Sequence, residues 1–167
     1  MSTTMVMSST TIHLAALVAQ SRVIDAQAIR LYAELTADFN PVHVDEDFAS
    51  KTPFGRTIAH GTLTLALIWQ AFDVTFGGDV LAGAEADIRF VKPVLVDTRV
   101  TASGSRVAAG CDDIWRVEVV NDDGVVVISG TVRLAGHELI SKREADTEAD
   151  TEAAMEIDLP GGFAAGR

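Results

Sequence analysis

The segment from residue 62 to residue 76 constrains the fold more than any other part of the chain. Apolar residues lie on nearly every side of the helix that this segment would form. Such a helix cannot face water and must be covered by other elements. The Gly77-Gly78 pair directly after it predicts the end of the helix. The sequence therefore predicts a buried central helix over residues 62–76.

After the two glycines the apolar residues alternate in the manner typical of strands. Four such segments follow, at residues 80–90, 94–107, 114–121 and 125–134. Residues 121–124 read Asn-Asp-Asp-Gly and tolerate the positive φ angles of tight turns, so the last two strands should form a hairpin. A sheet can bury one face against a single helix only by curving around it. We therefore expect an α+β domain with an antiparallel sheet wrapped around the helix.

Two weaker elements are predicted before the central helix. Residues 16–24 are a candidate strand, and Asp25 is a candidate N-cap for a helix that ends near Thr36. The next segment, residues 37–47, contains Asn40-Pro41, where the residue before the proline leaves helical geometry and the proline lacks an N–H group. We predict irregular chain there and again over residues 50–60.

Charge and composition narrow the class of partner and the domain organisation. The 167 residues include 13 basic and 24 acidic side chains, for a formal net charge of −11, which repels nucleic acid. Seven acidic side chains against three basic ones lie in residues 141–167, where large apolar residues are scarce. We expect a flexible leader at residues 1–10, one folded domain over residues 11–140, and a disordered acidic tail at residues 141–167.

The cysteine count and the apolar runs bear on the cellular location. Cys111 is the only cysteine, so the chain has no internal disulfide. The apolar run at residues 14–19 is short for a signal peptide and has no basic residue before it. No apolar run approaches the roughly 18–20 residues that a membrane span needs. We expect a cytoplasmic protein that does not cross a membrane and, because four histidines and one cysteine show no ligand spacing, holds no metal.

Asp38 and His43 are the strongest candidates for chemistry, since they flank the turn predicted at Asn40-Pro41. On a continuous helix they would point about 140° apart, whereas a turn can bring them together. A carboxylate and a neutral imidazole on one water can withdraw a proton from it and return a proton to a neighbouring carbon. Adding water to a conjugated carbon–carbon double bond requires both steps. An isolated pair with this spacing would more often be an ordinary turn aspartate and a structural histidine.

The residues around the pair favour the catalytic interpretation. Residues 35–45 read Leu-Thr-Ala-Asp-Phe-Asn-Pro-Val-His-Val-Asp, and residues 58–61 read Ile-Ala-His-Gly. Both segments resemble the motifs of the MaoC-like, (R)-specific enoyl-CoA hydratase family. A weaker likeness at residues 87–94, Asp-Ile-Arg-Phe-Val-Lys-Pro-Val, extends the resemblance over about residues 16–136. The resemblance implies a single hot-dog domain that reversibly hydrates a trans-2-enoyl-CoA, or another enoyl thioester, to the (R)-3-hydroxyacyl thioester. It implies no cofactor, because CoA is part of the substrate.

The resemblance also implies the roles of individual residues. Asp38 and His43 would hold the catalytic water, while Asn40 and Pro41 would support the loop between them. The backbone N–H group of Gly61 would bind the thioester oxygen, which agrees with the N–H groups that a helix N-terminus leaves free for negative charge.

One position departs from the family pattern. Relatives commonly have glycine immediately before the aspartate, where this chain has Ala37. We therefore expect a somewhat different backbone geometry at that position. Two other functions stay open on the same fold. One is an acyl thioesterase, in which the water attacks the carbonyl carbon, and the other is a non-catalytic partner subunit that binds an acyl thioester.

Several further residues are candidates for supporting roles. His60 is predicted to stabilise the loop rather than to exchange protons. Trp69 and Phe72 should lie in the core, with the wall of an acyl tunnel as the alternative. An unpaired edge strand predicts a homodimer, or a higher oligomer of hot-dog domains. Four basic residues are candidate contacts for the phosphates of CoA, with solvated surface residues as the alternative for each: Lys51, Arg56, Arg89 and Lys92.

Overall fold

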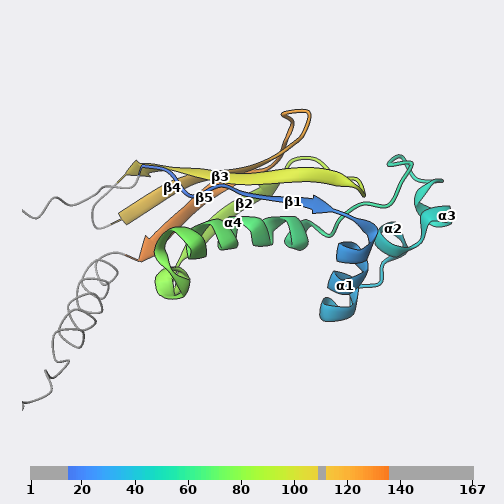
Figure 1. Ribbon diagram of the computed structural model, residues 1–167, viewed down its shortest axis with the longest axis horizontal. Helices are drawn as coiled ribbons and strands as arrows, with labels where there is room; N and C mark the ends of the chain where they lie inside the picture. The colour runs from blue at the N-terminus through green and yellow to red at the C-terminus, as the bar shows by residue number, and fades with distance from the viewer. Residues whose placement is uncertain (1–14, 109–111, 136–167) are drawn as a thin grey trace, which may run out of the picture. The chain divides into compact units, whose positions relative to one another are not determined.

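The computed structural model describes residues 15–108 and 112–135 (Figure 1). The predicted leader at residues 1–10 and the acidic tail at residues 141–167 lie outside the described residues. The elements follow in the order β1 (Gln20–Ile24), α1 (Ala26–Thr36), α2 (Pro41–Val44), α3 (Glu46–Ala49), α4 (Gly61–Phe76), the 3₁₀ turn η1 (Gly78–Leu81), β2 (Glu85–Phe90), β3 (Thr98–Ala108), β4 (Asp112–Asn121) and β5 (Val126–Ala135).

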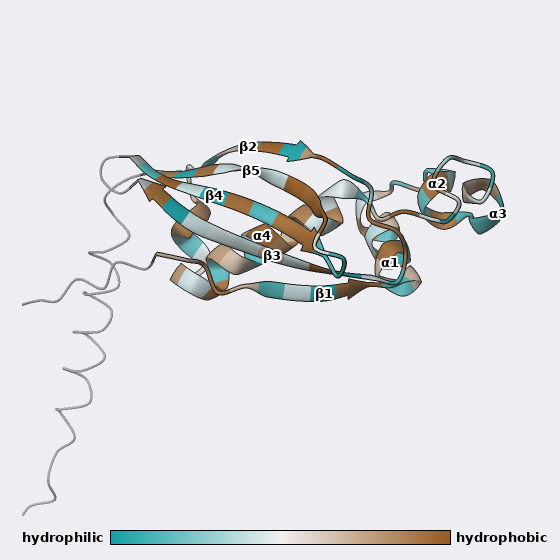
Figure 2. Cartoon of the chain, turned by 90° about the horizontal axis from the view of Figure 1, so that it is seen from above, coloured by the Kyte–Doolittle hydropathy of each residue, from teal (hydrophilic) through white to brown (hydrophobic). Residues whose placement is uncertain are grey.

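The strands form one antiparallel sheet in the order β1-β3-β4-β5-β2. Helix α4 runs along one face of this sheet and contacts β3, β1 and β4 (Figure 1). Figure 2 looks from above onto the face of the sheet that is opposite α4, with α4 behind the sheet and α1 to α3 toward one end. The predicted α+β class, with an antiparallel sheet around a central helix, is confirmed.

One face of α4 is fully buried against the sheet. Ile68, Ala71 and Phe72 on this face have no exposed surface, and Trp115 of β4 packs edge-on to Phe72 with ring centroids 5.8 Å apart. The prediction of complete burial is too strong, because the opposite face is only half-buried along much of its length and Val74 is 57% exposed. The helix ends at Phe76, as Gly77-Gly78 predicts, since Gly77 adopts a φ of 96°.

Several local predictions are confirmed by their hydrogen bonds. The Asp25 side chain accepts a hydrogen bond of 2.7 Å from the N–H group of Ala28, so Asp25 is the N-cap of α1. Asn121 accepts from the N–H groups of Asp123 and Val125, and Gly124 has a φ of 73° in the predicted hairpin turn. The strand predicted over residues 16–24 is present as β1 with Ile24 completely buried, but it begins only at Gln20.

Three predicted boundaries are wrong. The strand predicted over residues 80–90 begins only at Glu85, because the chain after Gly77-Gly78 first forms η1. The strand predicted over residues 94–107 begins at Thr98, after a turn in which Asp97 has a φ of 65°. Residues 37–47, predicted to be irregular, contain α2 and the start of α3. In the two strand cases, short turns with their own hydrogen bonds replace a pattern read only from hydropathy. In the loop, Asn40 caps a short helix and Pro41 takes its first position, which a proline tolerates.

No helix in residues 15–108 and 112–135 is long and apolar enough to cross a membrane.

Gly130 of β5 provides a test of how tightly β2 is held in the sheet. A Cβ atom at this position would overlap the carbonyl oxygen of Asp87 and press on Ile88 in β2. We expect Gly130→Ala to lower the free energy of unfolding by about 1–3 kcal/mol, the range for overpacked sites, as measured by urea denaturation. The control is Gly124→Asn, at an open position with φ of 73°, where asparagine tolerates the backbone conformation. Equal destabilisation by the two variants would contradict the prediction.

Candidate active site

The loop after α1 brings Asp38 and His43 to the same place. Helix α1 ends at Ala37, and the N–H groups of Ala37 and Asp38 both bond to the carbonyl oxygen of Ala33. Asn40 then caps α2 by accepting a hydrogen bond of 3.2 Å from Val42, with Pro41 as the first helical residue. The predicted turn at Asn40-Pro41 is therefore the start of a short helix, which carries His43 on its second half.

Ala37 adopts the left-handed conformation that favours glycine, with φ of 57° and ψ of 26°. The sequence led us to expect a different backbone geometry here because alanine replaces the usual glycine. The structure instead places the alanine in the helix-ending conformation typical of glycine, at some cost in stability. The following residue, Asp38, is then directed into the loop that leads to α2.

The imidazole of His43 is oriented by a backbone carbonyl group. Its Nδ1 atom lies 2.8 Å from the carbonyl oxygen of Ile58, which can only accept a hydrogen bond. In its neutral form the ring therefore carries its hydrogen on Nδ1, an assignment made from the bonding partner. The lone pair of Nε2 is left free to accept a hydrogen bond from a water or a ligand.

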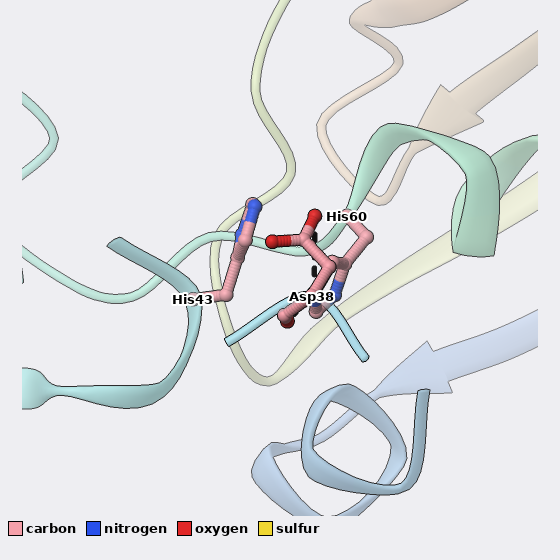
Figure 3. A group of neighbouring side chains, drawn as sticks. All are labelled: Asp38, His43 and His60. Carbon is pink, nitrogen blue, oxygen red and sulfur yellow. Dashed lines mark hydrogen bonds and ion pairs between the residues drawn. The ribbon is translucent and has the colours of Figure 1, made fainter. Parts of the chain in front are cut away.

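His60 joins this pair from the N-terminus of α4. Its ring stacks on the ring of His43, with centroids 3.9 Å apart and planes at 27°, and its Nε2 atom lies 3.0 Å from the carbonyl oxygen of Asp38. A carboxylate oxygen of Asp38 lies 3.9 Å from the same nitrogen (Figure 3). The predicted loop-stabilising role of His60 agrees with these contacts. Its direct approach to both Asp38 and His43 was not predicted from the sequence.

The three side chains lie beside a cavity of about 490 Å³. Asp38, His43 and Gly61 line one part of it, and residues 90–94 line another part. Asp38 is half exposed, with 53% of its side chain accessible, and His43 is half-buried. The cavity is therefore open to a ligand while the acid and the imidazole reach it together.

Gly61, the first residue of α4, lies where the backbone comes close to Phe90. A Cβ atom on Gly61 would come within 2.8 Å of the Phe90 ring. The first N–H groups of a helix have no partner within the helix and carry a partial positive charge. Gly61 lines the cavity near Asp38 and His43, so the start of α4 is a candidate donor to a negatively charged oxygen there.

Asp38, His43 and His60 also offer three ligand atoms within 4.8 Å of one another. One nitrogen of each histidine bonds to a backbone carbonyl oxygen, which leaves Nε2 of His43 and Nδ1 of His60 as the nitrogens open to a further ligand. The rings are stacked, so their in-plane lone pairs run side by side, whereas a metal needs both aimed at one point about 2.0–2.1 Å away. The arrangement fits a water held by a carboxylate and an imidazole.

The four candidate CoA contacts lie in different surroundings. Lys92 lines the cavity beside Asp38. Arg56 forms an ion pair of 3.0 Å with Asp97 and lines a second cavity of about 350 Å³ that also reaches His43. Lys51 and Arg89 are exposed and line neither cavity. The structure therefore brings one of the four basic residues to the main cavity.

The two predicted core aromatics lie away from the main cavity. Phe72 is fully buried and Trp69 half-buried, and neither lines the cavity. The wall is formed in part by residues that were not singled out from the sequence, including Thr64 and Ile128. Thr64 could have been found only as a polar residue in an apolar helix, one turn after His60.

The chain is similar in sequence to proteins of known family. The family described as "MaoC like domain" matches residues 8–129. The 3-hydroxyacyl-thioester dehydratase Z of Mycobacterium tuberculosis (strain ATCC 25618 / H37Rv) is 34% identical over 117 residues, which cover 68% of this chain and 73% of that protein. An (R)-specific enoyl-CoA hydratase of Rhodospirillum rubrum is 34% identical over 83 residues, covering 50% of this chain and 58% of the relative.

A solved structure shows the same fold. The (R)-hydratase from A. caviae superposes with a TM-score of 0.67 at 24% identity, covering 76% of this chain and 98% of that chain. At this identity the likeness concerns the fold alone. It confirms the predicted hot-dog arrangement of the sheet around α4.

From the left-handed conformation of Ala37 we predict the effect of a substitution there on the free energy of unfolding. Ala37→Gly is expected to raise the free energy of unfolding by about 1 kcal/mol, because glycine adopts the left-handed conformation without steric cost. Thermal or urea denaturation measures the change. The matched control is Ala33→Gly in the interior of α1, which should destabilise the protein, since Ala33 is buried and glycine is a poor helix residue. A destabilising effect of Ala37→Gly would contradict the interpretation.

Proposed function

Because the chain belongs to the MaoC-like domain family, we propose that Asp38 and His43 catalyse the reversible hydration of a trans-2-enoyl thioester to the (R)-3-hydroxyacyl thioester. The enzyme is a hydro-lyase. The observation that supports these site residues is the convergence of a carboxylate and an oriented imidazole on one cavity at the N-terminus of α4.

In the proposed mechanism, Asp38 and His43 orient the water because both accept hydrogen bonds. The Asp38 carboxylate accepts hydrogen bonds, and so does Nε2 of His43, because Nδ1 carries the hydrogen toward Ile58. A water between them donates both of its hydrogens and keeps an oxygen lone pair free. That lone pair attacks the β carbon of the enoyl thioester. Asp38 takes the released proton and returns a proton to the α carbon.

Negative charge develops on the thioester oxygen as the new carbon–oxygen bond forms. The N–H group of Gly61 at the start of α4 is the proposed donor to this oxygen. The water and the acid both act from the side of the cavity that Asp38 and His43 line, so both additions occur on one face of the double bond. Asn40 and Pro41 keep their predicted role, since they begin the short helix that carries His43.

We propose contacts between the basic residues and the CoA part of the substrate, and separately a cytoplasmic location. Lys92 is the proposed phosphate contact nearest the reaction, since it lines the cavity, and Arg56, Lys51 and Arg89 are proposed to contact more distant parts of CoA. The mechanism needs no cofactor beyond the substrate. A cytoplasmic location is supported by the single cysteine, which forms no disulfide within the chain.

We propose that two copies pair through strand β2. This strand lies at one edge of the sheet, and five of its six residues are exposed. Phe90 and the following Val91 are 56% and 50% exposed and line the cavity, so pairing at this edge would cover apolar surface beside the site. Antiparallel pairing of two identical strands would also set Glu85 or Asp87 opposite Arg89 of the second copy.

Substitution of the acid and the imidazole tests the reaction. Asp38→Asn and His43→Ala should each lower turnover of an enoyl-CoA such as crotonyl-CoA by about 10²–10⁴-fold, because the first removes the carboxylate that takes and returns the proton and the second removes an acceptor for the water. The assay follows loss of the conjugated-thioester absorbance, with the chirality of the product determined. Asp47→Asn, at an exposed position in α3 outside both cavities, is the matched control and should retain activity.

A free-thiol assay run beside the absorbance assay separates the alternatives, because cleavage of the thioester would also remove the conjugated-thioester absorbance. Release of free thiol without consumption of the double bond would identify a thioesterase. Unchanged hydration in both Asp38→Asn and His43→Ala would remove the proposed mechanism.

The proposed dimer makes a second prediction. The full chain should sediment as a homodimer, and Phe90→Glu should shift it toward the monomer, because the charge would be buried between the two β2 strands. Sedimentation velocity measures the shift. Leu35→Glu, on α1 and 80% exposed, is the control for adding a charge at an exposed apolar position outside this edge. A wild-type protein that stays monomeric with full activity would contradict the dimer.

A further inference from the structure

His60 occupies the N-cap position of α4 without capping it. The residues that usually take this position accept a hydrogen bond from the first turn of the helix, and the His60 side chain makes no such bond. The side chain is instead 3% exposed and directed toward Asp38 and His43 (Figure 3). The structure therefore uses this position for contacts outside α4.

The first contact fixes the backbone of Asp38. The carbonyl oxygen of Asp38 only accepts hydrogen bonds, so Nε2 of His60, 3.0 Å away, must donate to it. At the other end of the residue, a carboxylate oxygen of Asp38 accepts from the N–H group of Asn40 at 3.2 Å. Asp38 is thus held through its main chain by one helix and through its side chain by its own loop.

The second contact fixes the ring plane of His43. The hydrogen bond to Ile58 determines the direction of Nδ1 but leaves the ring free to tilt about that direction. The stacked ring of His60, 3.9 Å away, removes this remaining freedom. The two contacts together determine where Nε2 of His43 points.

Burial of the second nitrogen indicates that the imidazole is present for these contacts. Nδ1 of His60 is buried and has no hydrogen-bond partner among the described residues. A buried nitrogen without a partner destabilises a fold, so an apolar ring would serve better if packing were the only requirement. The hydrogen bond from Nε2 is what an apolar ring could not supply.

We propose that His60 is a positioning residue that sets the separation of Asp38 and His43 and itself exchanges no proton with the substrate. This inference rests on the proposed roles of Asp38 and His43. Because His60 directly precedes Gly61, the same residue also joins the acid and the imidazole to the N–H group proposed for the thioester oxygen. The start of α4 then fixes the positions of Asp38, His43 and the N–H group of Gly61 relative to one another.

Two substitutions at His60 separate positioning from packing. His60→Phe keeps a buried aromatic ring and removes the donor, whereas His60→Gln keeps a donor near the place of Nε2 and removes the ring. We expect kcat to fall about 10–100-fold in His60→Phe, the cost of displacing catalytic groups by a fraction of an ångström to an ångström, with KM changed less than about twofold. We expect His60→Gln to recover part of kcat.

The melting temperatures of His60→Phe and His60→Gln should rank opposite to their kcat values. Phenylalanine suits the buried position better than a polar amide does, so His60→Phe should melt at the higher temperature. A residue with only a packing role would show kcat following the melting temperature. Positioning instead predicts that the less stable variant, His60→Gln, is the more active one.

A further pair covers the case in which His60→Phe does not fold. His60→Asn differs from His60→Gln by one methylene, but its shorter side chain does not reach the carbonyl oxygen of Asp38, and at the N-cap position it can stabilise α4. Higher kcat in His60→Gln than in His60→Asn, although His60→Asn melts at the same or a higher temperature, supports the hydrogen bond.

Trp115→Phe measures the effect of core destabilisation alone. Trp115 packs against Phe72 and Phe76, which lie 11 and 15 residues after Gly61, or about 17–22 Å along the helix axis. This variant should melt at a lower temperature and retain kcat. A kcat of His60→Phe within about twofold of wild type, or kcat values that follow melting temperature across the variants, would overturn the role of His60.

Different results would contradict the positioning role of His60 and the proposed hydration reaction. If Asp38→Asn is inactive while His60→Phe is fully active, the proposed reaction stands and the positioning role falls. If Asp38→Asn and His43→Ala remain active, the proposed function itself falls, whatever the His60 variants do.

Discussion

The fixed position of helix α4 is the constraint on which the site depends. Ile68 and Phe72 are completely buried against the sheet, so the helix cannot slide or turn without exposing apolar surface or opening a cavity. Its first residue, Gly61, is therefore fixed beside residues 90–94 at one end of the main cavity. The loop residues Asp38 and His43 come from exposed or half-buried chain and gain their order by contacting this rigid end.

The sequence was sufficient for elements whose determinants are local or strongly periodic. The apolar run that became α4 had to be covered, and Gly77-Gly78 had to end it. Asp25 was recognisable as an N-cap, and residues 121–124 as a turn, because their side chains bond to their own neighbours. The convergence of Asp38 and His43 followed from a proline in the intervening loop. The identity of the family came from the motif around them rather than from any periodicity.

The features that the sequence did not reveal depend on contacts distant along the chain. His60 lies 22 residues from Asp38, and its stacking on His43 exists only once α4 and the loop are placed. The strand boundaries were misplaced for a similar reason. Val80 and Val94 are buried, as their hydropathy indicates, but they are buried from turns and irregular chain rather than from strands. Hydropathy reports burial, and it reports backbone conformation only where hydrogen-bond partners agree.

In the proposed mechanism, hydrogen-bond direction explains why the water is held by two acceptors, a carboxylate and a histidine. A backbone carbonyl group forces the hydrogen of neutral His43 onto Nδ1, so the imidazole faces the cavity as an acceptor. A second acceptor, the Asp38 carboxylate, then obliges a bound water to donate twice and to leave its oxygen lone pair unengaged. Two donors in the same places would engage that lone pair and suppress its attack. The carbonyl group of Ile58, which has no chemistry of its own, therefore decides how the water is oriented.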